Sequence, residues 1–158
     1  MNDQPKPEFI IIGAMKCGTS SLHRALEQHP RVFIPEGEMK YYSMDDLEQN
    51  TVFFRHQENQ WIAQNFAENH AASLTLYQQR YLNCPRDSIA GEDASSYLAI
   101  TEVAKRLHEN LPEVKLIVIL RDPVARTYSH YWHNVASFRA HYDFEDSLRF
   151  AQENLLRR

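Results

Sequence analysis

Residues 13–21 combine glycines, a lysine and hydroxyl side chains in an order that suits a bound anion. Gly13 and Gly18 enclose Lys16, and three hydroxyl residues follow directly. Glycines allow backbone N–H groups to converge on one anion, and the N-terminus of a following helix adds partial positive charge. The segment predicts a phosphate-binding loop, with a tight turn without ligand as the alternative. The predicted binding residues are Lys16, Cys17, Gly18, Thr19, Ser20 and Ser21.

The spacing of these two glycines equals that of the ATP-binding pattern GxxxxGK[ST]. Thr19 stands where that pattern has its lysine, and Lys16 lies inside the loop instead. The lysine that contacts the β- and γ-phosphates of a magnesium nucleotide is therefore missing from its usual position. This disfavours a P-loop kinase or ATPase, which stays an alternative hypothesis.

A second candidate anion site lies in the segment LIVILRDPVARTYSHY, residues 116–131. An apolar strand runs into Arg121, and a predicted helix places Ser129 eight residues later. A guanidinium offers a planar pair of donors to a phosphate, and a hydroxyl can close the other side. We predict that Arg121 and Ser129 bind a second phosphate; an ion pair of Arg121 with a nearby carboxylate is the alternative. Arg126 is a weaker candidate that we expect to be solvated.

These two segments resemble a known family. IIGAMKCGTSSL is similar to the 5′-phosphosulfate loop of the sulfotransferases, especially the bacterial and glycan-directed branch, and LIVILRDPVARTYSHY resembles their 3′-phosphate motif. The resemblance implies 3′-phosphoadenosine 5′-phosphosulfate as the sulfuryl donor. It implies that Lys16 contacts the bridging oxygen and the sulfuryl group, that the residues from Gly18 to Ser21 hold the 5′-phosphate, and that Arg121 and Ser129 hold the 3′-phosphate.

Two further stretches resemble the family near its acceptor. Residues 35–42, PEGEMKYY, are similar to a Lys-Glu-x-x-aromatic-aromatic stretch whose glutamate acts as base, and the aromatic pair aligns that role with Glu38. Glu36 is the near competitor, and a solvated loop glutamate is the alternative. Residues 91–98, GEDASSYL, resemble a stretch beside the acceptor pocket, with Ser95 in place of a proline. A simple turn at the end of a strand explains that stretch equally well.

The elements that must position these residues alternate between strand and helix patterns. Such alternation favours an α/β fold with a parallel sheet, whose ligands bind beyond the carboxyl ends of the strands. We expect a P-loop-like three-layer sandwich forming a single domain over residues 1–158. Predicted strands are 9–12, 31–34, 89–92 and 115–120, the first and last of them buried; predicted helices are 20–29, 60–69, 73–82, a helix from Thr101 to about Leu111, one capped by Asp122, and 144–156.

Composition limits the remaining function classes. The formal net charge is −4, with 43% hydrophobic and 24% charged residues. A mildly acidic chain disfavours broad nucleic-acid binding, and no run approaches the roughly 20 apolar residues of a membrane helix. We expect two reduced cysteines, a cytoplasmic protein, and no membrane or nucleic-acid partner. The histidines, including His130, His133 and His141, complete no recognisable zinc pattern, so no metal is expected.

The resemblance ends before the family's later part. No Arg-Lys-Gly-like segment, which in the family closes over the 3′-phosphate and adenine, is present in the sequence. We therefore expect the N-terminal portion of a longer domain, apparently truncated at its C-terminus. The leading hypothesis is transfer of a sulfuryl group to a hydroxyl or amine of a small-molecule or glycan acceptor. A non-catalytic nucleotide-binding module or an inactive fragment is the alternative, and the oligomeric state stays open.

Overall fold

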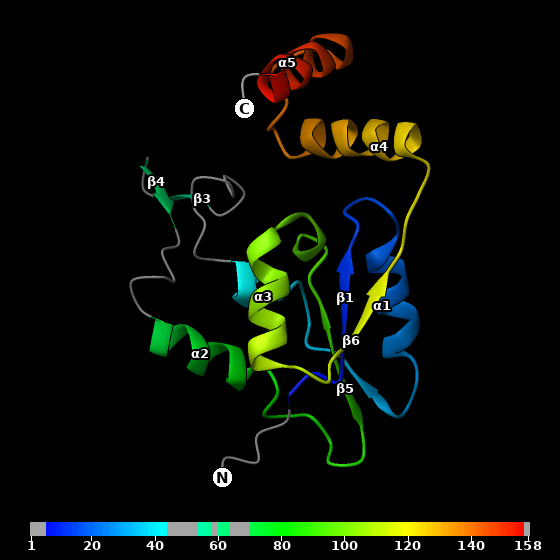
Figure 1. Cartoon of the computed structure of the whole chain (residues 1–158), viewed down its shortest axis with the longest axis vertical. Coiled ribbons are helices and arrows are strands. Elements are labelled where there is room, and N and C mark those ends of the chain that lie inside the picture. The colour runs from blue at the N-terminus through cyan, green and yellow to red at the C-terminus, as the bar shows by residue number, and fades with distance from the viewer. Residues whose placement is uncertain (1–5, 44–53, 58–59, 64–69, 157–158) are drawn as a thin grey trace.

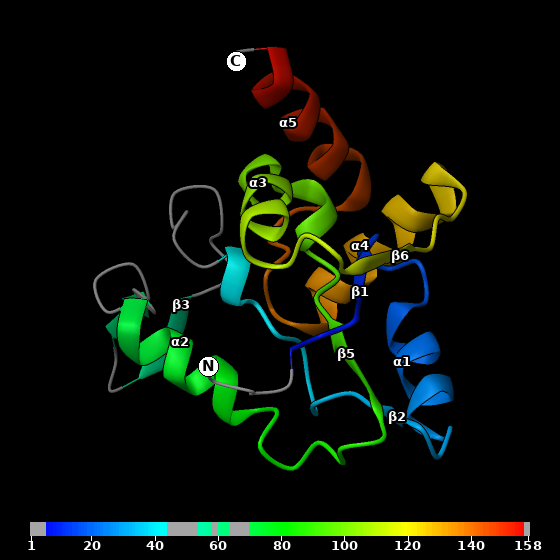
Figure 2. The same cartoon turned by 60° about the horizontal axis from the view of Figure 1, so that its bottom comes forward.

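A computed structural model describes residues 6–43, 54–57, 60–63 and 70–156. Figures 1 and 2 show helices on both sides of a central sheet, and two further helices beyond one end of it. The elements, in chain order, are β1 (Phe9–Gly13), α1 (Thr19–Glu27), β2 (Val32–Phe33), the 3-10 helix η1 (Tyr41–Ser43), β3 (Phe54–Gln57), β4 (Gln60–Ala63), α2 (His70–Gln79), β5 (Ile89–Asp93), the 3-10 helix η4 (Tyr97–Ala99), α3 (Thr101–Asn110), β6 (Lys115–Val118), α4 (Pro123–Ala136) and α5 (Phe144–Leu156).

The central sheet is parallel and has the strand order β2-β5-β1-β6. β1 lies between β5 and β6, with Phe9 opposite Gly91 on one side and Lys115 on the other. A strand paired on both edges and covered on both faces should be apolar throughout. β1 fits this rule, because Ile10 and Ile11 are both 0% exposed.

The two faces of β1 build two separate parts of the core. Ile10 and Ile12 pack in a large cluster that includes Val103 and Leu107 of α3. Phe9 and Ile11, which point the other way because side chains alternate along a strand, belong to a smaller cluster with residues of α1. Figure 1 shows α1 and α3 on opposite sides of β1. The predicted three-layer α/β arrangement with a parallel sheet is confirmed.

The helix predicted over residues 60–69 was wrong in its first four residues. Residues 60–63 form β4, which pairs antiparallel with β3, so that His56 lies opposite Trp61. Trp61 and Ile62 favour extended backbone, and the partner strand β3 lies in a segment whose residues show no clear helix or strand pattern. Residues 64–69, the rest of that predicted helix, lie outside the described residues. The helix predicted over 73–82 is present as α2 but begins at His70.

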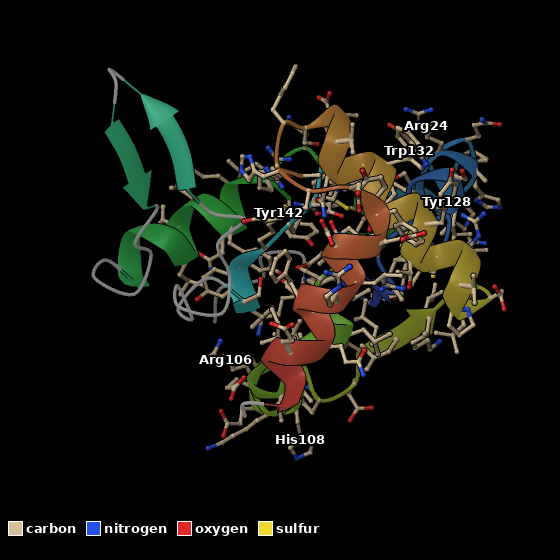
Figure 3. The ribbon with its side chains drawn as sticks, turned by 90° about the horizontal axis from the view of Figure 1, so that it is seen from above. Arg24, Arg106, His108, Tyr128, Trp132 and Tyr142 are labelled. Atoms are coloured by element: carbon tan, nitrogen blue, oxygen red, sulfur yellow. The ribbon has the colours of Figure 1, made fainter. Side chains whose placement is uncertain are left out.

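The prediction that residues 115–120 form a buried strand was half wrong. β6 is a strand, but it lies at one edge of the sheet, and Leu116 is 50% exposed. After β6 the chain leaves the sheet, and α4 lies across the carboxyl end of the strands (Figure 1). Two aromatic side chains of α4, Tyr128 and Trp132, are each 51% exposed. Figure 3 looks down on them at the surface of α4.

The core also holds an ionisable group. Glu92, next to the carboxyl end of β5, is 0% exposed and accepts a hydrogen bond of 2.7 Å from the hydroxyl of Tyr77. Tyr42 and Tyr97 pack in the same cluster. Burial raises the pKa of Glu92 to about 7, although hydrogen bonds from the tyrosines lower it. The protein thus keeps a proton-binding carboxyl in its interior.

Candidate functional site

The loop between β1 and α1 takes its shape from unusual backbone conformations. Gly18 precedes α1 with a φ of 97°, and Lys16 inside the loop has a φ of 66°. Non-glycine residues rarely adopt this region, and strained residues of this kind gather at ligand sites. At Gly13 the close approach of other residues requires glycine, because a Cβ there would lie 2.9 Å from Cβ of Leu98 and 3.0 Å from the carbonyl oxygen of Ser95.

The start of α1 leaves backbone donors available. The first N–H groups of any helix have no partner within it. Here they belong to Thr19 and Ser20, because the N–H of Ser21 already donates to the carbonyl of Gly18 at 3.0 Å. α1 begins at Thr19, one residue before the predicted start at residue 20, because Gly18 supplies the left-handed turn into the helix. The loop therefore presents N–H groups, hydroxyls and the Lys16 ammonium in one short stretch.

Backbone hydrogen bonds join this loop to the second predicted anion site. The N–H of Ala14 donates to the carbonyl of Ile119 at 2.9 Å, and the N–H of Ile119 donates to the carbonyl of Gly13 at 2.8 Å. Arg121 follows two residues later. Asp122 then caps α4, accepting from the N–H of Ala125 at 2.9 Å, and a proline occupies the first turn. This cap confirms the predicted helix start.

The two segments and the predicted base line one cavity of about 600 Å³ at the carboxyl end of the sheet. Every predicted site residue except Cys17 belongs to its wall. These are Lys16, Gly18, Thr19, Ser20, Ser21, Glu38, Arg121 and Ser129. Residues more than a hundred positions apart in the sequence thus meet around a single space.

Glu38 is held at the edge of this cavity by two side chains. The hydroxyl of Ser95 donates to Oε1 of Glu38, and Nζ of Lys40 lies 3.7 Å from Oε2. The segment itself is fixed to β5, because the N–H of Met39 donates to the carbonyl of Asp93 at 2.9 Å. Both predicted acceptor-side stretches, residues 35–42 and 91–98, therefore contribute to one corner of the site.

The cavity wall contains basic and hydroxyl groups that sequence reasoning missed: Lys40, His133, Ser137 and Arg139. His133 and Ser137 follow Ser129 at intervals of four along α4, so the helical period offered a signal for them. Arg139 returns to the cavity because Phe138, with a φ of 55°, turns the chain after α4. Partial burial and the charge of Lys16 lower the pKa of His133, which favours its neutral form.

Other candidates lie elsewhere. The thiol of Cys17 is 3.8 Å from the carbonyl oxygen of Met15 and is not part of the cavity wall. Arg126 lies 3.5 Å from His130 in a different depression. Glu36 lines a neighbouring cavity that also contains Glu38. Within the described residues, no group of three or more His, Cys, Asp or Glu side chains is arranged to hold a metal ion.

Comparison with known proteins identifies the family of the chain. A profile of the sulfotransferase family matches residues 7–158. The chain belongs to the sulfotransferase family. A crystal structure of a sulfotransferase from Alicyclobacillus acidocaldarius superposes on the chain with a TM-score of 0.73 and 28% identity, covering 97% of this chain and 60% of that one. The P-loop-like fold is thereby also shown.

Curated relatives agree in family but are much longer. The membrane-associated sulfotransferase kil1 of Dictyostelium discoideum is 28% identical over 79% of this chain and 22% of its own length. Heparan sulfate glucosamine 3-O-sulfotransferase 5 of Mus musculus is 27% identical over 81% of this chain and 31% of its own length. The chain thus spans less than a third of either relative. None of the helices in the described ranges is long and apolar enough to cross a membrane.

Proposed function

We propose that this chain carries the donor site of a sulfotransferase that moves a sulfuryl group from 3′-phosphoadenosine 5′-phosphosulfate to a hydroxyl or amine acceptor. The observation that carries the proposal is the single cavity in which the loop from Lys16 to Ser21, Arg121 with Ser129, and Glu38 meet. Membership of the sulfotransferase family supports the same activity.

The residues present fit this donor. The cavity of about 600 Å³ lies within the range of roughly 300–1,000 Å³ that small-molecule sites occupy. Its wall offers cations at two separate places, Lys16 in the loop and Arg121 before α4, as two separated phosphates require. Thr19, Ser20 and Ser21 with the first N–H groups of α1 would hold the 5′-phosphate, and Arg121 with Ser129 the 3′-phosphate. When bound, the donor supplies an activated sulfuryl group.

Each predicted catalytic residue has one task in this scheme. Glu38 would accept the proton of the acceptor as its oxygen or nitrogen bonds to sulfur. Lys16 would stabilise the negative charge on the phosphate oxygen that leaves sulfur, since a preorganised cation acts most strongly where charge develops. The hydroxyl of Ser95 and the ammonium of Lys40 hold the Glu38 carboxylate toward the cavity. The acceptor is a small molecule or a glycan.

Replacement of Lys16 by alanine tests the proposal. We expect transfer of radiolabelled sulfate to fall by about 100- to 1,000-fold, the usual cost of removing one group that stabilises a developing anion. Lys105→Ala is the matched control, because Lys105 is an exposed lysine of α3 and the change removes the same charge. Equal transfer by the Lys16→Ala variant and the control would contradict the assigned role.

The non-catalytic alternative gives a different result in the same samples. A binding module would bind 3′-phosphoadenosine 5′-phosphate, as measured by calorimetry, and would transfer no sulfate. A kinase would bind ATP only with magnesium, which the position of Thr19 disfavours. Binding of the 3′-phosphorylated nucleotide together with sulfate transfer supports the proposed enzyme over both.

A further inference from the structure

A second cavity of about 410 Å³ adjoins the donor site. Ser20 and Glu38 belong to the walls of both cavities, so the proposed base lies at their junction. α1, the loop at residues 36–38 and the end of β5 form this second cavity, which we call the acidic chamber. Its position beside Glu38 is where an acceptor must lie if Glu38 is to take its proton.

The two cavities differ in charge. Four carboxylates line the acidic chamber, from Glu27, Glu36, Glu38 and Asp93, against the basic side chains of His23 and Arg24. The donor cavity has the reverse character: among the described residues Glu38 is the only carboxylate of its wall, which includes two lysines and two arginines. The basic wall of the donor cavity suits an anionic donor, whereas the acidic chamber disfavours an anionic acceptor. Like charges brought together in a partly desolvated site cost free energy.

Asp93, in the wall of the chamber, has one carboxylate oxygen without a hydrogen-bond partner in the described part of the chain, an observation independent of the charge comparison. Its side chain is 4% exposed, and Oδ2 lies 3.1 Å from Nδ1 of His23. Oδ1 is buried and has no hydrogen-bond partner among the described residues. A buried carboxylate oxygen without a donor costs free energy, and Asp93 belongs to the wall of the chamber. Burial raises the pKa of Asp93, and the neighbouring charge of Glu38 raises it further.

A metal ion does not fit this chamber. Divalent cations need several carboxylate, carbonyl or imidazole ligands at short distances. Among the described residues, no three His, Cys, Asp or Glu side chains are close enough together to bind one. An organic cation, whose charge lies on N–H donors carried by a larger molecule, needs no such ligand set and can lie against the carboxylates of the wall while the rest of the molecule fills the chamber.

We propose that the acidic chamber is the acceptor site and that it selects acceptors bearing a protonated amine close to the hydroxyl that is sulfated. The ammonium lies against the carboxylate of Asp93 in the wall of the chamber, and Glu27 and Glu36 of the same wall add negative potential. The hydroxyl then lies at the junction, beside Glu38. This inference rests on the proposed function for its chemistry, but the charge preference is a property of the chamber alone.

Calorimetry with three sugars of one ring size tests the preference. Glucosamine carries an ammonium, N-acetylglucosamine is neutral at the same position, and glucuronate is an anion. With and without saturating 3′-phosphoadenosine 5′-phosphate, we expect glucosamine to bind about tenfold more tightly than N-acetylglucosamine, as a hydrogen bond between charged groups implies. Glucuronate should bind most weakly.

Two variants locate the effect. Asp93→Asn should remove most of the glucosamine preference, and Glu27→Gln, at an exposed position of α1, should reduce it by about threefold. Glu27→Gln keeps the test decisive if the buried substitution prevents folding. Glu109→Gln, an equal charge change on α3, is the control and should leave the preference intact.

The results separate this inference from the proposed function. Glucuronate binding as tightly as glucosamine, or an unchanged preference in both chamber variants, would overturn the acceptor assignment even if the nucleotide binds. If the unsubstituted protein binds no 3′-phosphoadenosine 5′-phosphate but still prefers glucosamine, the result would count against sulfuryl transfer. It would still support the chamber as an ammonium site.

Discussion

Arg121 and Arg126 lie five residues apart, yet only Arg121 reaches the donor cavity. Arg121 precedes the cap of α4 and lines the cavity with Ser129. Arg126 follows within the helix and lies beside His130, 3.5 Å from its ring nitrogen. The position of each guanidinium relative to the start of α4 thus decides which of them can meet a phosphate.

Arg121→Ala should weaken the nucleotide that carries a 3′-phosphate far more than the one that lacks it. A charge-assisted hydrogen bond contributes about 1.5–3 kcal/mol, so the dissociation constant of 3′-phosphoadenosine 5′-phosphate should rise by roughly 10- to 100-fold. That of adenosine 5′-phosphate should change little. Arg126→Ala is the matched control, with both nucleotides measured by calorimetry. An equal loss for both nucleotides in Arg121→Ala would refute the 3′-phosphate assignment.

At the scale of elements, the start of α4 positions both residues of the proposed 3′-phosphate site, Arg121 before the helix and Ser129 within it. Asp122→Ala removes the side-chain acceptor for the N–H of Ala125, and loss of such a cap costs about 1 kcal/mol. We expect a lower free energy of unfolding in urea and weaker nucleotide binding. Asp122→Asn should preserve both, because asparagine caps helices as well as aspartate. The same losses in both variants would mean that the charge of Asp122, not its cap, is what matters.

Local patterns were sufficient for the elements that hold the phosphate groups. The apolar run before Gly13 and the Asp-Pro pair at the start of α4 predicted a strand and a helix start that the structure confirms. The exposure of β6 was not predictable in this way, because strand order depends on distant pairings. For the same reason Arg139 was missed, since its place in the cavity depends on how the chain turns after α4.

Across the whole molecule, the described residues form a well-packed half and an open half. The cluster around β1, α2 and α3 is buried, whereas α4 contains no buried residue. Leu120, between β6 and α4, is 74% exposed, and Val124, in the first turn of α4, is 75% exposed. Global stability should therefore depend mainly on the cluster that surrounds Glu92.

Glu92 should make the free energy of unfolding depend on pH in a defined direction. Its folded-state pKa of about 7 lies above the ordinary value of 4.5. Below pH 4.5 both states hold the proton, and the contribution of Glu92 to stability is fully present. As the pH rises toward 7 the unfolded chain ionises first, so this contribution is lost. The difference between the two pKa values corresponds to a loss of about 3 kcal/mol above pH 7.

Glu92→Gln isolates this effect, because the amide keeps the size of the side chain and does not ionise. Urea unfolding of both proteins between pH 5 and pH 8 should show the variant gaining on the wild type by roughly 2–3 kcal/mol as the pH rises. Other titrating groups, such as the His23–Asp93 pair, are common to both proteins and cancel in the difference. Parallel profiles would mean that Glu92 has the same proton affinity in the folded and unfolded chains, and that the tyrosines around it offset its burial completely.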